Sequence, residues 1–163
     1  MGLTHIDQKN QPTMVDVSDK SLTKRSATAE CFVELGGDIM KHLSDGDLLS
    51  KKGPVFATAI IAGTQGVKRC ADLIPFCHVI PIESCRITID PVSADTVRVL
   101  CEVQTTYKTG VEMEALTGAS VAGLTIIDMC KAMSQTITLT QTKLIEKTGG
   151  KRDFKASSSL SSH

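Results

Sequence analysis

The stretch TGVEMEALTGASVAGLTIIDMCKA, residues 109–132, decides the fold of this chain. Its length and apolar spacing predict one long helix from about Gly110 to Met133. A run of glycine, alanine and serine leaves little side chain along part of that helix, so a neighbouring element can approach very closely. That neighbour is another element of the same chain, a symmetric partner chain, or both.

The segments around this helix alternate between strand and helix patterns. Residues 28–35 alternate like a strand, and residues 53–74 repeat apolar positions with helical spacing. Residues 82–90 and 96–104 predict a hairpin, and residues 136–147 predict a last strand. This order predicts an α+β, ferredoxin-like split βαβ fold, in which an antiparallel sheet carries its helices on one face.

The 163 residues are enough for one core, and no repeat or linker divides them. We expect an N-terminal arm, partly flexible, over residues 1–22, which are polar apart from one short apolar alternation at residues 14–17. A single domain would follow over residues 23–154. The Ser-rich residues 155–163 predict a disordered tail.

The composition excludes several classes of partner. The 18 basic and 18 acidic residues cancel, so no global field recruits nucleic acid or an anionic membrane. No uninterrupted apolar run approaches the roughly 20 residues of a membrane span. The six cysteines form no Cys-x-x-Cys pair and predict small, reduced core residues. We therefore expect a cytoplasmic protein, or a mitochondrial matrix protein if the source is eukaryotic.

Asp128 and Lys131 are the first candidates for chemistry. They are three residues apart and therefore neighbours on one helix face. One interpretation is an exposed ion pair of little energetic value. The apolar residues around them favour a second interpretation, in which solvent is scarce, the pKa values are shifted, and the two groups act as general base and general acid.

The start of the same helix carries Glu112 and Glu114, where acids also complement the helix dipole. The fourteen residues between Glu114 and Asp128 span about 21 Å at about 1.5 Å per residue. One small ligand would not contact both. Either the ligand is elongated, such as a nucleotide with a phosphate chain, or the face belongs to a groove shared with another subunit.

The remaining candidates are a histidine and several lysines. His78 lies beside Cys77 between two prolines, where a structural role and a site role are equally supported. A metal site would need more ligands, so we predict no metal. Lys52, and Lys147 with Lys151 in KTGGK, are either solvated surface charges or contacts for phosphate.

Three motifs occur in order: LIPFCH at residues 73–78, KTGVEMEALTGASVAGLTIIDMCKA at residues 108–132 and KTGGKRDF at residues 147–154. Together with LTHID, MVDVS and KKGPVFATAIIAGTQGVKR, they closely resemble the cyclic pyranopterin monophosphate synthases of molybdenum cofactor biosynthesis, the MoaC family. The resemblance extends from Leu3 to Phe154.

This resemblance implies a ferredoxin-like subunit in a homohexamer, a trimer of dimers with active sites at the dimer interfaces. It implies a lyase that converts 3′,8-cyclo-7,8-dihydroguanosine 5′-triphosphate to cyclic pyranopterin monophosphate and releases pyrophosphate, the second reaction of molybdopterin biosynthesis. It also implies no metal centre and no organic cofactor.

By position in the motifs, the resemblance makes Asp128 and Lys131 the catalytic pair. It assigns substrate binding to two further sets. The set lining the pterin-forming pocket comprises Phe76, Cys77, His78, Met113 and Glu114; the set holding phosphates or ribose comprises Lys52, Lys68, Lys147 and Arg25, with Glu112 in support.

Two other functions compete with this prediction. Ferredoxin-like domains also serve as non-catalytic regulatory modules that bind small ligands at dimer interfaces, and turnover distinguishes these from enzymes. An RNA-binding domain of the RRM type is disfavoured, because the predicted strands lack aromatic pairs and a basic sheet face.

Overall fold

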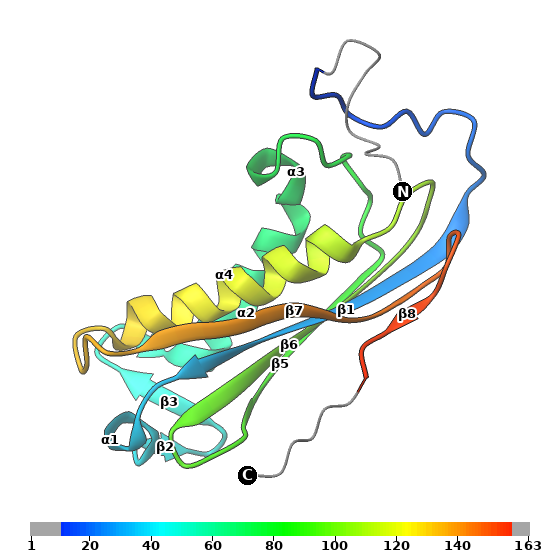
Figure 1. Ribbon diagram of the computed structural model, residues 1–163. Coiled ribbons are helices and arrows are strands. Elements are labelled where there is room, and N and C mark those ends of the chain that lie inside the picture. Colours follow the sequence, from blue (N-terminus) through cyan, green and yellow to red (C-terminus); the bar gives the residue numbers. More distant parts are fainter. Residues whose placement is uncertain (1–10, 158–163) are drawn as a thin grey trace.

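The computed structural model describes residues 11–157. Over these residues the long strands form a five-stranded sheet in the order β5-β6-β1-β7-β8, and three short strands form a second sheet in the order β2-β3-β4. The helices α2 and α4 lie on one face of the five-stranded sheet (Figure 1). The elements are β1 (Thr23–Glu34), α1 (Gly37–Met40), β2 (Leu43–Ser44), β3 (Asp47–Ser50), β4 (Gly53–Pro54), α2 (Val55–Lys68), α3 (Cys70–Leu73), β5 (Ser84–Pro91), β6 (Thr96–Tyr107), α4 (Glu112–Cys130), β7 (Thr138–Thr148) and β8 (Phe154–Lys155).

The topology confirms the predicted ferredoxin-like split βαβ fold. Strands β1 and β5 flank β6, which is antiparallel to both, and β7 pairs with the other edge of β1. The chain runs from β1 through α2 to β5, and from β6 through α4 to β7. Each helix therefore crosses over the sheet between two strands that are not adjacent to each other.

The core lies between the sheet and the two helices. On β1, alternate residues from Ala27 to Val33 are buried, and on β6 the buried set runs from Val97 to Val103. Their period of two turns one face of each strand toward the helices. The cysteines belong largely to this core: all six are free thiols, and Cys31, Cys70, Cys101 and Cys130 are buried.

Glycines let α2 and α4 approach each other closely. A Cβ atom added at Gly63 would lie 2.6 Å from Cδ1 of Ile87 and 2.8 Å from the carbonyl oxygen of Gly118. A Cβ atom at Gly118 would in turn collide with Val67 and lie 2.7 Å from Sγ of Cys101. One close neighbour of the small-residue helix is thus α2 of the same chain.

The local boundaries differ from the prediction in two places. The helix expected over residues 53–74 breaks at Arg69, although the apolar stripe continues through Cys70. Residues 43–54 form the small β2–β4 sheet, whose first turn places Asp45 and Gly46 at positive φ. An Asp-Gly pair is a recognised hairpin signal. These strands are two to four residues long, too short for a visible alternation.

Asp47 in this small sheet caps α2 from a distance in sequence. Its Oδ1 accepts hydrogen bonds from the backbone amides of Leu48 at 2.6 Å and Phe56 at 2.7 Å, and Oδ2 accepts one from Ala57 at 3.0 Å. The carboxylate therefore satisfies two free amides in the first turn of the helix. It also fixes the small sheet, and the Lys51-Lys52 turn within it, against α2.

Helix α4 has 19 residues and is, by length and composition, the one helix among the described residues that could span a membrane. It packs against α2, β1, β6 and β7, and more than half of its residues are buried there. Its apolar character is therefore explained by the core. The predicted tail begins at Lys155, which lies in β8, and residues 158–163 and 1–10 lie outside the described residues.

Gly63→Ala should lower the free energy of unfolding by about 1–3 kcal/mol, because the methyl group would push α2 away from the Gly118 carbonyl. Urea denaturation followed by circular dichroism measures this value. Gly37→Ala is the matched control, because its Cβ would meet nothing closer than the Ala94 carbonyl at 3.9 Å. Equal stability of Gly63→Ala and the parent protein would contradict the close helix packing.

Candidate active site

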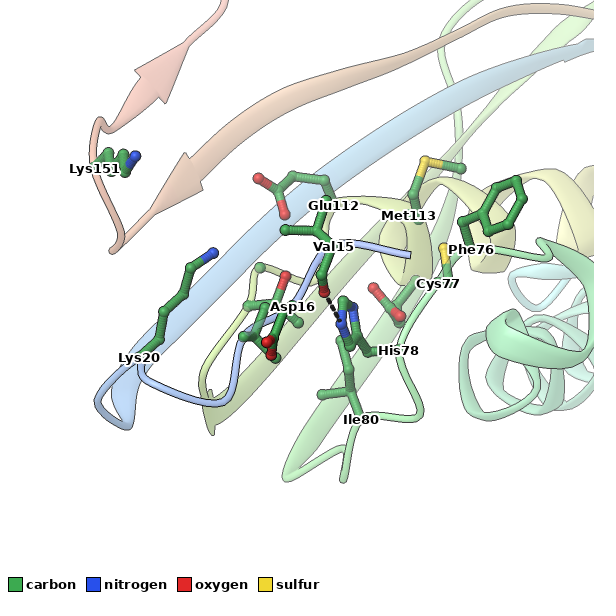
Figure 2. Close-up of a pocket in the computed structure, with 14 residues that line it drawn as sticks. Val15, Asp16, Lys20, Phe76, Cys77, His78, Ile80, Glu112, Met113 and Lys151 are labelled. Atoms are coloured by element: carbon green, nitrogen blue, oxygen red, sulfur yellow. Dashed lines mark hydrogen bonds between the residues drawn. The ribbon is translucent and has the colours of Figure 1, made fainter. Parts of the chain in front are cut away.

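A cavity of about 630 Å³ lies at the N-terminal end of α4 (Figure 2). Four segments far apart in sequence form its walls: the arm before β1, the connection between α3 and β5, the first turn of α4 with the residues before it, and Lys151 in the turn between β7 and β8. Six predicted substrate-binding residues line it together: Phe76, Cys77, His78, Glu112, Met113 and Glu114.

His78 is held by the arm. Its Nε2 lies 2.8 Å from the carbonyl oxygen of Val15. A carbonyl only accepts hydrogen bonds, so Nε2 carries the proton in the neutral ring, and Nδ1 is then the basic nitrogen. The sequence did not decide between a structural role and a functional role for His78. In the structure His78 lies on the cavity wall, and the hydrogen bond places the proton of the neutral ring on Nε2.

Glu114 is the buried acid of this cavity. Its side chain belongs to a residue only 4% exposed, and burial raises the pKa of its carboxyl above the ordinary value. The like charge of Glu112 acts in the same direction. Burial also raises the pKa of the neighbouring Cys77 thiol, so this cysteine is not a preformed thiolate.

The predicted phosphate-binding residues are distributed around this end of the molecule. Lys147 forms an ion pair with Glu112, its Nζ 2.8 Å from Oε1. Lys68 lines a small adjoining cavity of about 50 Å³ together with His78 and Glu114. Arg25 lines a further cavity beside the main one. Lys52 is absent from this group because it lies at the other end of α4.

At the C-terminal end of α4, Asp128 bridges two lysines. Its Oδ1 lies 2.6 Å from Nζ of Lys131, and its Oδ2 lies 2.7 Å from Nζ of Lys52. Lys52 also donates to the backbone carbonyl of Asp128 at 3.0 Å. The turn between β3 and β4 brings Lys52 to this position, so the small sheet serves to complete a Lys-Asp-Lys cluster.

The expectation that solvent is scarce around this pair is wrong for the single chain. The side chains of Asp128 and Lys131 are 54% and 58% exposed. Ile126 and Cys130 face the core, and Asp128 is two residues from each, about 200° around the helix. Hydrogen bonds from Lys131 and then Lys52 lower the pKa of Asp128 to about 2, so it is ionised at neutral pH.

The two groups of predicted residues are therefore separated within one chain. The helix rise places Glu114 and Asp128 about 21 Å apart. The main cavity offers a histidine, a buried carboxyl and an aromatic ring, and the Lys-Asp-Lys cluster offers charged groups for proton transfer. Neither half contains every residue assigned from the motifs.

The sequence did not predict that the arm would form part of the cavity. Val15, Asp16, Val17 and Lys20 all line it. The apolar alternation over residues 14–17 was the available signal, since it turns Val15 and Val17 to the same side. Within residues 11–157, no group of three or more His, Cys, Asp or Glu side chains is arranged to hold a metal ion.

The fold and the cavity define a ferredoxin-like α+β protein with a cavity lined by both charged and apolar side chains. Residues 14–150 match the MoaC family, and the chain belongs to that family. It is 54% identical over 154 residues to a protein of Xanthomonas campestris pv. campestris (strain 8004) named cyclic pyranopterin monophosphate synthase; the match covers 94% of this chain and 93% of that protein.

Two longer relatives contain a similar segment. A molybdenum cofactor biosynthesis bifunctional protein of Synechocystis is 54% identical over 92% of this chain and 44% of its own length. Molybdenum cofactor biosynthesis protein 1 of Dictyostelium discoideum is 48% identical over 91% of this chain and 26% of its own length. The matched unit therefore occurs both nearly alone and within larger proteins.

The ion pairs predict the titration of Asp128. In a carboxyl ¹³C NMR titration, Asp128 should remain ionised down to about pH 2, and Lys131→Met should move its midpoint upward. Lys41→Met is the matched control, since Lys41 pairs with Asp38 and does not contact Asp128. A parent midpoint at the ordinary aspartate value would contradict the bridging geometry.

Proposed function

We propose that this chain is a cyclic pyranopterin monophosphate synthase, a lyase of molybdenum cofactor biosynthesis. It would convert 3′,8-cyclo-7,8-dihydroguanosine 5′-triphosphate to cyclic pyranopterin monophosphate and pyrophosphate. One observation carries the proposal: three separated motifs shared with the synthases, at residues 14–18, 76–78 and 112–114, supply side chains to one cavity.

The cavity suits the ring system of such a substrate. Phe76 and Met113 are exposed apolar side chains on its wall. His78 and Glu114 supply polar groups for the ring edges, and a buried carboxyl with a raised pKa is a stronger base, once ionised, than an exposed carboxyl. These groups would handle protons as the guanine imidazole ring opens and the pyran ring forms.

The Lys-Asp-Lys cluster supplies the catalytic pair. With two ammonium groups bound, the Asp128 carboxylate is a weak base. A substrate phosphate that takes over the Lys52 ammonium removes one of these cations, and the pKa of Asp128 then rises. Lys131 would donate protons, and Lys52 would stabilise the charge on pyrophosphate as a ribose-derived hydroxyl attacks the α-phosphate.

The separation of the two half-sites supports an active site shared between chains. The main cavity of one chain would face the Lys-Asp-Lys cluster of a second chain across a dimer interface. Exposed apolar side chains occur at both ends: Leu49 and Met133 line a cavity beside Lys52, and Phe76 lies at the main cavity. We propose a homohexamer of three such dimers, cytoplasmic, without nucleic acid, membrane, metal or organic cofactor.

Incubation of the purified protein with the cyclic triphosphate, followed by mass spectrometry, tests the reaction. Cyclic pyranopterin monophosphate and pyrophosphate should appear in equal amounts. Asp128→Asn and Lys131→Ala should each lower kcat about 10²–10⁴-fold, the usual contribution of a general acid or base, with substrate affinity largely retained.

Lys143→Ala is the matched control, because Lys143 pairs with Glu30 on the face of the sheet that points away from α4. Tight binding without conversion by the parent protein would instead favour the non-catalytic regulatory module. Normal kcat in both Asp128→Asn and Lys131→Ala would remove them from the catalytic assignment.

Subunit mixing tests the shared site. His78→Ala and Lys131→Ala, each inactive alone, should regain about a quarter of the parent activity after joint refolding, because mixed dimers hold one intact site. Joint refolding of Asp128→Asn with Lys131→Ala is the control, and it should stay inactive because both changes affect the same half-site. Lack of recovery in proven mixed dimers would contradict the shared arrangement.

A further inference from the structure

We propose that Asp47 and Ser50 are positioning residues for Lys52: they hold the turn between β3 and β4 so that the Lys52 ammonium reaches Asp128. Neither residue lies in a motif that the chain shares with the synthases. The inference rests on the proposed function, since it concerns the support of the proposed catalytic cluster.

Lys52 depends on its backbone for its position because solvent competes for its ammonium group. Nζ lies 2.7 Å from Oδ2 of Asp128 and donates to the backbone carbonyl of the same residue at 3.0 Å. The lysine side chain is 53% exposed, so packing does not fix its rotamer. An exposed ion pair returns little of the side-chain entropy that it costs. Both contacts therefore require that the turn carrying Lys52 is already in place.

Ser50 shapes the turn from which Lys52 projects. Its Oγ accepts a hydrogen bond from the backbone amide of Lys52 at 3.1 Å and donates one to the carbonyl of Gly53 at 3.1 Å. Gly53 pairs with Ser50 in the β3–β4 ladder and takes φ 111, a conformation that favours glycine. The hydroxyl group thus bridges the two sides of the turn and fixes the direction in which Lys52 leaves it.

Asp47 fixes the same hairpin against α2. Pro54, at the N-cap of α2, makes no side-chain capping hydrogen bond, and the first turn of the helix contains no acidic residue. The Asp47 carboxylate supplies the missing acceptor to the amides of Phe56 and Ala57. Asp47 begins β3 and Ser50 ends it. The strand is therefore anchored on α2 at its start and carries the turn at its end.

The small sheet consequently joins the start of one helix to the end of the other (Figure 1). Asp47 brings a negative charge to the N-terminus of α2, and Lys52 brings a positive charge to the last turn of α4, which has no basic residue of its own. These are the favourable signs at the two ends. Because α2 and α4 pack against each other, a hairpin held on α2 presents Lys52 to α4 at a fixed place.

Carboxyl ¹³C NMR titration of Asp128 tests this positioning without substrate. Ser50→Ala should raise the midpoint of Asp128 above the parent value, because the Lys52 ammonium that lowers it is no longer held. Ser50→Thr keeps a hydroxyl group and should retain the parent midpoint. Ser44→Ala is the matched control, since that hydroxyl donates to Asp45 in the other turn of the small sheet. A parent midpoint in Ser50→Ala would overturn the proposal for Ser50.

Lys52→Met separates positioning from other effects on Asp128. It removes the ammonium group altogether, so it should raise the midpoint at least as far as Ser50→Ala does. Adding Ser50→Ala to Lys52→Met should raise the midpoint no further, because both changes remove one contact. A further rise in the double variant would show that Ser50 acts on Asp128 by another route, and it would overturn the positioning role.

Asp47→Asn tests the anchor on α2. Asparagine is also a good helix cap, so the variant should keep the parent circular dichroism spectrum. Its side chain offers one acceptor oxygen in place of two, so the hairpin should loosen and the midpoint of Asp128 should rise. An unchanged midpoint in folded Asp47→Asn would remove Asp47 from the proposal.

Kinetics with the cyclic triphosphate complete the test. Ser50→Ala should lower kcat/KM about 10- to 100-fold, the usual cost of a misplaced group, whereas Ser50→Thr and Ser44→Ala should keep the parent value. Parent kcat/KM in Ser50→Ala would overturn the catalytic consequence of the positioning. Absence of turnover in the parent protein would reject the proposed function, while a raised Asp128 midpoint in Ser50→Ala would still support the positioning of Lys52.

Discussion

The close packing of α4 against α2 and the sheet is the constraint on which the rest of the structure depends. At Gly63, Gly118 and Gly123 an added Cβ atom would enter a neighbouring side chain or backbone atom. A helix seated this deeply is held along its whole length and cannot bend its ends toward each other. The distance of about 21 Å between Glu114 and Asp128 is therefore a fixed property of the chain. A reaction that needs both ends therefore requires either an elongated substrate or a second copy of the chain.

The regular elements could be predicted because each carries a periodic pattern over many residues. The helical stripe and the alternating strands gave the order of elements, and that order is typical of the ferredoxin-like fold. The small β2–β4 sheet could not be predicted in this way, because Asp47 joins it to α2 through a contact between residues nine apart. The break at Arg69 also has no signal, since the apolar stripe continues across it.

Part of the lining of the main cavity could be predicted from the motifs, but the geometry of the cavity could not. The motifs identified Phe76, His78 and Glu114, and the fold brings them to one cavity. The solvent exposure of Asp128 was predicted wrongly. Apolar neighbours in the sequence do not show which side of the helix a residue occupies. The arm residues Asp16 and Lys20 were missed because their positions depend on contacts with His78 and Lys108, which lie far away in the chain.

The two carboxyl groups of the proposed shared site are shifted in opposite directions. Burial raises the pKa of Glu114, whereas two ammonium groups lower the pKa of Asp128. Titratable groups whose environments separate their pKa values are the usual basis for dividing acid and base roles in an active site. Here the separation arises from different causes at the two ends of one helix. The burial of Glu114 does not depend on a ligand, whereas a phosphate can replace Asp128 as the partner of an ammonium group. Substrate binding would therefore change Asp128 more than Glu114, and the basicity of Asp128 would appear only when the nucleotide is in place.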